Sequence, residues 1–244
     1  MRPFGNGALR PYLSAHRMAR VLAWCAAAGL VSLAGACGHA NVEPRAGATL
    51  PVGPHAEAAA ALGLPPLASA RLASDERELR LWISPPYGSH LELYRLHARG
   101  ADVRGVAAGS WSTDLGADAT GEDTAAMEEF ARHMRGQFGC ERVEARQARA
   151  VCASALSPRA PEWAALLRAL DSLGVDTLPG SSASGLDGFR LTVETRRGAA
   201  YRVYSYWSPS RESLVDDERR AADVMGRLRQ ARERIAAAGA AGRR

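Results

Sequence analysis

The fold of this chain is decided by residues 78–83, which read Glu-Leu-Arg-Leu-Trp-Ile. Leu79, Leu81 and Ile83 recur at every second position, which is the period of a β-strand. Residues 85–88, Pro-Pro-Tyr-Gly, then supply a turn or loop. We therefore expect ordered structure to begin here, with a strand.

More strands are expected, two shortly after this segment and two nearer the C-terminal end of the chain. Apolar residues in 91–96 predict a second strand, 99–102 a turn, and 103–111 a third strand, together an antiparallel meander. Residues 189–195 and 201–207 flank the turn Arg-Arg-Gly and predict a further hairpin.

Three helices are predicted from apolar residues at helical spacing. They cover about 122–135, then 161–173 with proline in its first turn, and finally the arginine-rich C-terminal segment. In the last helix, Ser213 is the expected N-cap and Leu214 the first residue of the buried stripe. Hairpins together with helices indicate an α+β domain.

The N-terminal region has the features of an export signal. Arg17 and Arg20 precede an apolar run at 21–36 that is about 16 residues long, shorter than the roughly 20 residues of a membrane-spanning helix. We expect residues 1–36 to be a cleaved signal peptide, with Met18 as an alternative start residue.

The end of this signal, Leu33-Ala34-Gly35-Ala36-Cys37, resembles a bacterial lipobox. The resemblance implies a lipoprotein anchored to the membrane through a lipid on Cys37. Because Gly38 rather than aspartate follows, it favours the outer membrane, facing the periplasm. The same residues fit the A-x-A rule of ordinary signal peptidase, so a soluble periplasmic protein cut after Ala36 remains the alternative.

The remainder of the chain divides by composition. Residues 38–73 are rich in Ala, Pro and Gly, and only 57–62 could form a short helical turn. We therefore expect a flexible tether over 37–76, a single α+β domain over 77–238 and a frayed tail over 239–244.

The charge of the chain gives no sign of a nucleic-acid partner. All 31 basic residues are arginine, and four of them precede Cys37, where no acidic residue lies. The part from Cys37 onward therefore carries 27 arginines against 26 acidic residues. A nucleic-acid-binding domain would show a clear basic excess.

Cys140 and Cys152 are expected to form a disulfide, because export places them in an oxidising compartment. If residues 140–154 form a hairpin that turns near Arg146, the two cysteines face each other at a separation that a disulfide permits. A reactive or metal-binding pair is the alternative, but no His or third Cys accompanies them at a zinc spacing.

Motifs of catalysis are not recognised. The serine-rich segment 180–185 is not G-x-S-x-G, and no phosphate-binding or dinucleotide fingerprint occurs. We therefore predict no catalytic residue, no metal and no cofactor. The alternative is a periplasmic hydrolase-like enzyme in which His90, His97 or His133 meets a carboxylate or serine.

Arg202, Tyr204, Tyr206 and Trp207 form the candidate binding surface, because arginine beside aromatic residues suits a binding groove. The plainer interpretation is a two-faced strand with one face in the core.

The body of the chain also resembles exported bacterial proteins without assigned activity. The stretches concerned are Leu81-Trp82-Ile83 to Leu93-Tyr94-Arg95-Leu96, Trp163-Ala164-Ala165-Leu166-Leu167 to Leu178-Pro179, Asp187-Gly188, and Tyr201-Arg202-Val203-Tyr204-Ser205-Tyr206. The expected function is a non-catalytic binding or structural lipoprotein of the cell envelope, with the membrane and an envelope protein as its partners.

Overall fold

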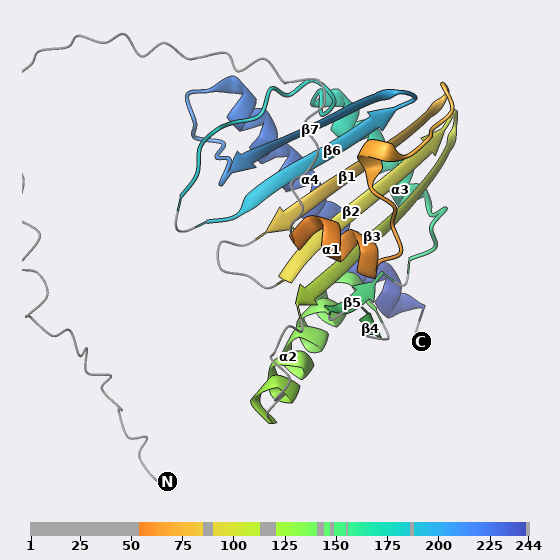
Figure 1. Ribbon diagram of the computed structural model, residues 1–244, viewed down its shortest axis with the longest axis vertical. Coiled ribbons are helices and arrows are strands. Elements are labelled where there is room, and N and C mark those ends of the chain that lie inside the picture. The colour runs from red at the N-terminus through yellow and green to blue at the C-terminus, as the bar shows by residue number, and fades with distance from the viewer. Residues whose placement is uncertain are drawn as a thin grey trace, which may run out of the picture. The chain divides into compact units, whose positions relative to one another are not determined.

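The computed structural model describes residues 54–84, 90–112, 121–140, 144–146, 149–154, 156–185 and 188–242. Its centre is a seven-stranded antiparallel sheet in the order β4-β5-β3-β2-β1-β6-β7 (Figure 1). The strands are β1 (Glu76–Ser84), β2 (His90–Arg99), β3 (Asp102–Ser112), β4 (Glu144–Arg146), β5 (Arg149–Ala153), β6 (Arg190–Arg197) and β7 (Ala200–Trp207).

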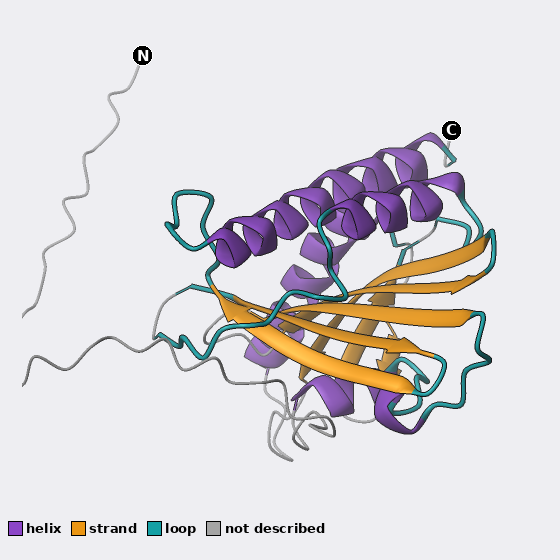
Figure 2. Cartoon of the chain, turned by 90° about the horizontal axis from the view of Figure 1, so that it is seen from above, coloured by secondary structure: helices purple, strands orange, loops and turns teal. Residues whose placement is uncertain are grey.

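Helices cover the two faces of this sheet unequally. The larger ones, α2 (Gly121–Phe138), α3 (Pro161–Ser172) and α4 (Asp216–Ala241), lie on one face (Figure 2). The short α1 (Pro54–Ala61) and the 3₁₀ helix η2 (Leu67–Ser69) lie on the other, which we call the outer face (Figure 1). The α+β prediction is confirmed. None of the described helices combines the length and the apolar character that a membrane span requires.

The predicted meander is confirmed, with β1 at its inner edge. Leu79 and Leu81 are fully buried in the core beneath the helices, whereas Arg80 and Trp82 point to the outer face because successive side chains of a strand alternate. β1 pairs with β2 on one side and with β6 on the other. Residues 78–83 therefore belong to an interior strand of the sheet.

Two glycines of β3 allow the helices to approach the sheet closely. A Cβ atom on Gly105 would lie 2.2 Å from the Trp163 ring, and one on Gly109 would lie 1.6 Å from the Met134 methyl carbon. Trp163 and Met134 are both completely buried. Each pairing puts a large side chain directly over a residue that has none, so the core fills without voids.

The predicted helices are confirmed, with one correction at the start of α4. The helix begins at Asp216, and Leu214, expected in the buried stripe, is 97% exposed. Ser213 does not cap the helix, because its Oγ accepts the amide of Val215 at 3.1 Å. This hydrogen bond closes a local turn that precedes the helix, so the Ser213 hydroxyl does not accept from an amide in the first turn of α4.

The predicted tether is wrong for residues 54–75. Ala58 and Ala59 of α1 are buried against Trp82, Leu91 and Leu93 on the outer face. An alanine-rich segment has the composition of a linker, but small side chains also let a helix lie close to a sheet. Residues 37–53, which include Cys37, lie outside the described residues, as does the whole predicted signal peptide.

The C-terminal ends of α2 and α4 both lie further along the chain than predicted. α2 continues through Gly136 and ends at Phe138, and the φ of +62° at the following Gly139 suits glycine. α4 extends to Ala241, so the predicted frayed tail is helical over residues 239–241.

The Cys140–Cys152 disulfide is present, with the two Cα atoms 6.0 Å apart. The register behind the prediction is wrong, since β4 and β5 pair Glu144 with Val151. Cys140 precedes β4 and follows directly on the end of α2. The disulfide therefore ties α2 to β5 and does not bridge two opposed strand residues.

We predict that replacing both cysteines, C140A/C152A, costs about 3 kcal/mol of unfolding free energy because the cross-link no longer restricts the unfolded chain. The melting temperature should fall by roughly 6–12 °C, measured by calorimetry. Reducing agent should lower the wild-type value similarly and leave the variant unchanged. A wild-type melting temperature equal to that of the variant would contradict the prediction.

His55, in the first turn of α1, lies between this helix and the sheet. Its Nε2 is 2.9 Å from the Ser84 Oγ, and its ring centroid is 5.4 Å from that of Trp82. Burial, followed by the charges of Arg190 and Arg149, lowers the pKa of His55 to about 4. The imidazole is therefore neutral in the folded protein at neutral pH.

This neutral imidazole predicts that stability falls as the pH drops from 6.5 towards 4. In that range the unfolded chain binds a proton on His55 and the folded chain does not, so protons favour unfolding. His55→Gln should remove this part of the loss, at most about 3 kcal/mol. Urea unfolding of both proteins at neutral pH and near pH 4 measures it. Equal losses in the two proteins would show that His55 has no part in the effect.

Candidate functional site

The outer face carries two adjacent rows of charged residues across β6, β1, β2 and β3. The first row consists of Glu194, Arg80, Arg95 and Val106, each paired with its neighbour in the strand register. Strand alternation gives all four the same face. Arg80 and Arg95 are direct cross-strand neighbours, an arrangement that is unfavourable for like charges unless a carboxylate lies between them.

The second row supplies that carboxylate. It consists of Arg196, Glu78, His97 and Arg104, again in direct register. Glu78 is therefore bordered by the two arginines of the first row and by His97 in its own. Across the two rows, four arginines face two glutamates, so this part of the outer face is basic.

Glu78 holds both central arginines by hydrogen bonds. Its Oε1 accepts Arg80 Nε at 2.7 Å and Arg95 Nε at 2.9 Å, and its Oε2 accepts Arg95 Nη2 at 2.7 Å. Burial alone would raise the pKa of Glu78, but Arg95 and Arg80 outweigh it and hold the pKa below its usual range. Since Glu78 is 4% exposed and Arg80 1%, each charge depends on the other for its burial.

Glu194 completes the buried network on the β6 side. Trp82 Nε1 donates to its Oε1 at 2.7 Å, and the Tyr201 hydroxyl donates to its Oε2 at 3.2 Å. Burial raises the pKa of Glu194, although the Trp82 hydrogen bond and the Arg80 charge oppose the rise. The side of the network next to β6 is therefore enclosed by aromatic side chains.

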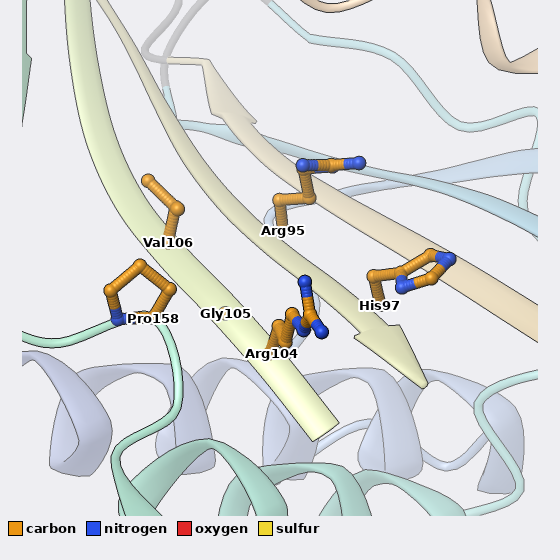
Figure 3. Close-up of a pocket in the computed structure, with 6 residues that line it drawn as sticks. All are labelled: Arg95, His97, Arg104, Gly105, Val106 and Pro158. Carbon is orange, nitrogen blue, oxygen red and sulfur yellow. The ribbon is translucent and has the colours of Figure 1, made fainter. Parts of the chain in front are cut away.

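The opposite side of the network opens into a cleft of about 390 Å³. We call it the basic cleft, and it is lined by Arg95, His97, Arg104, Gly105, Val106 and Pro158 (Figure 3). The three basic side chains rise from β2 and β3 on the side away from the helices (Figure 3). A volume of this size is typical of a small-molecule site.

The wall opposite β2 comes from the loop before α3. β5 pairs with β3 from Ala108 onward, and no described strand pairs with the first half of β3 on that side. The loop fills this edge, where Gly105 N donates to Pro158 O at 2.8 Å. Trp163 Nε1 of α3 donates to Ser157 O at 3.0 Å and so fastens the loop on the helix side of the sheet.

The cleft retains several hydrogen-bond donors. Within the described part of the chain, Arg95 Nη1, Arg104 Nη1 and both ring nitrogens of His97 have no protein partner. Among the described residues, Arg104 forms its ion pair with Asp102, at 3.1 Å, and both side chains are about half exposed. The six lining residues present cationic donors together with apolar surface, and this combination recognises anions.

The candidate surface predicted from the sequence is not a groove. Tyr204 and Tyr206 are buried in the core, 6% and 2% exposed, and the Tyr204 hydroxyl donates to Val175 O. Arg202 on the same face donates to two backbone carbonyls. Trp207 lies on the outer face, where Arg190 stacks on its ring at 5.4 Å. The plainer interpretation, a two-faced strand, is the correct one.

The histidines of the enzyme hypothesis are divided between two places. His97 lines the basic cleft beside two arginines. His90 and His133 lie together on the helix side, with ring centroids 6.2 Å apart. Burial, and then the charge of His133, lowers the pKa of His90. Among the described residues, no cluster of three or more His, Cys, Asp or Glu side chains could hold a metal ion.

No protein-family model, curated protein or solved structure matches this chain.

We predict that Glu78→Gln lowers the unfolding free energy by about 3 kcal/mol, because it removes the charged acceptor that the buried Arg80 shares with Arg95. Glu233→Gln, at an exposed position of α4, makes the same chemical change and should cost less than about 0.5 kcal/mol. Urea denaturation of both variants measures the difference. A loss for Glu78→Gln no larger than that of the control would contradict the role of this network.

Proposed function

We propose that the protein is a lipoprotein of the cell envelope whose folded domain binds a small anionic ligand without transforming it. The observation that carries the binding role is the convergence of Arg95, His97 and Arg104 in one cleft on a rigid pair of strands. Guanidinium and imidazole donors are suited to recognise anions. The six lining side chains offer no carboxylate or hydroxyl to act with His97 as a catalytic pair.

The proposed location rests on the resemblance of Leu33 to Cys37 to a lipobox and on the apolar run before it. The Cys140–Cys152 disulfide supports it, because disulfides persist in exported proteins and are rare in the cytoplasm. In this proposal a lipid on Cys37 holds the domain at the outer membrane, facing the periplasm.

We predict that Cys37→Ser abolishes acylation, because it removes the thiol that would carry the lipid. Intact mass and membrane fractionation in the native host measure this. Cys25→Ser, within the predicted signal peptide, is the matched control and should behave as the wild type. A mature wild-type protein without acyl mass, or a Cys37→Ser variant with unchanged membrane retention, would contradict the anchor.

A further inference from the structure

We propose that the ligand of the basic cleft is a small phosphomonoester, with its phosphate group held by Arg95, His97 and Arg104. This inference rests on the proposed function and adds the chemical class of the ligand. Four features of the cleft support it: the number of free donors, their spacing, the way in which the arginines are held, and the apolar wall beside them.

The free donors exceed what a carboxylate needs. Glu78 shows that one guanidinium satisfies a carboxylate, since Arg95 donates to both of its oxygens. The cleft adds the remaining Arg95 nitrogen, the guanidinium of Arg104 and the imidazole of His97. A phosphate has three strongly accepting oxygens and a charge close to −2 at neutral pH. It can therefore accept from all three side chains at once.

The spacing of the three side chains fits one shared anion. His97 and Arg104 are directly opposed in the strand register, and Arg95 lies two residues from His97 on the same face. Cβ atoms of directly opposed residues are about 4.5–5.5 Å apart, and diagonal neighbours about 7–8 Å. Arginine side chains are long enough to span such a triangle, and both arginines rise on the same side of the strands as His97 (Figure 3).

The two arginines are prepared for binding in different ways. Glu78 fixes the Arg95 guanidinium with two hydrogen bonds, so little side-chain freedom is lost when a ligand binds. Within the part of the chain that the structure describes, Arg104 is held by Asp102, in a half-exposed ion pair that contributes little stability. A phosphate can therefore recruit Arg104 without disturbing the buried network.

The rest of the cleft suits the organic part of a phosphomonoester. Val106 and Pro158 line the side away from His97, and the loop that carries Pro158 is fastened to the β3 edge. Apolar walls beside a few polar anchors are typical of small-molecule sites. A phosphodiester, such as a phospholipid headgroup, has one charge fewer and one bridged oxygen more, so it should bind more weakly.

The test is calorimetric titration of the purified full-length protein with phenyl phosphate, methyl phenyl phosphate and benzoate in low salt and neutral detergent. We expect phenyl phosphate to bind at least fivefold more tightly than the other two. Arg104→Gln should weaken phenyl phosphate binding about tenfold, as expected for the loss of one charge-assisted contact. His97→Gln is a second variant that tests the cleft if Arg104→Gln does not fold.

Arg99→Gln is the matched control. This exposed arginine ends β2 and pairs with Asp75 outside the cleft, so the same charge is removed and binding should be unchanged. Equal binding of the diester would indicate a headgroup-like ligand and overturn the phosphomonoester proposal. Tighter binding of benzoate would overturn it while leaving anion binding intact. If none of the three compounds binds, the proposed binding function fails as well.

Discussion

The structure depends on one buried carboxylate. Glu78 lies in β1, an interior strand of the sheet, is 4% exposed, and accepts hydrogen bonds from Arg80 on its own strand and from Arg95 on β2. Removing Glu78 would leave the buried Arg80 without its hydrogen-bond acceptor in a low-dielectric setting, which is costly. The same contact fixes the guanidinium of Arg95, a residue that also lines the basic cleft. The stability of the sheet and the geometry of the candidate site therefore share a single side chain.

Most of the fold follows from local patterns in the sequence. Alternation at Leu79 and Leu81 predicts the buried face of β1, and the apolar stripe of α3 predicts the buried face of that helix, because both patterns report which side chains avoid water. The sequence predicts only a short helical turn over 57–62 and not the burial of α1, since its alanines carry no periodic signal and Ala59 is buried with Trp82, 23 residues further along the chain. Long-range packing of this kind leaves no trace in local spacing.

The candidate site was less predictable than the fold. The turn at residues 99–102 places His97 opposite Arg104, and this register could have been derived from the sequence. The wall formed by Pro158 could not, because it depends on a loop that packs against an unpaired strand edge. Tyr204 and Tyr206 were predicted to line a binding surface because they are aromatic residues near an arginine, but they are buried in the core. The cysteine pairing was predicted correctly from a hairpin register that is wrong.

The measurement that tests the account most directly is nuclear magnetic resonance of the arginine Nε–H and histidine ring signals during addition of phenyl phosphate. If phenyl phosphate binds in the basic cleft, the signals of Arg95, His97 and Arg104 should shift and saturate, and those of Arg99 and Arg190 should stay unchanged. Shifts that are scattered over the surface arginines, or that never saturate, would contradict a built anion site in the basic cleft.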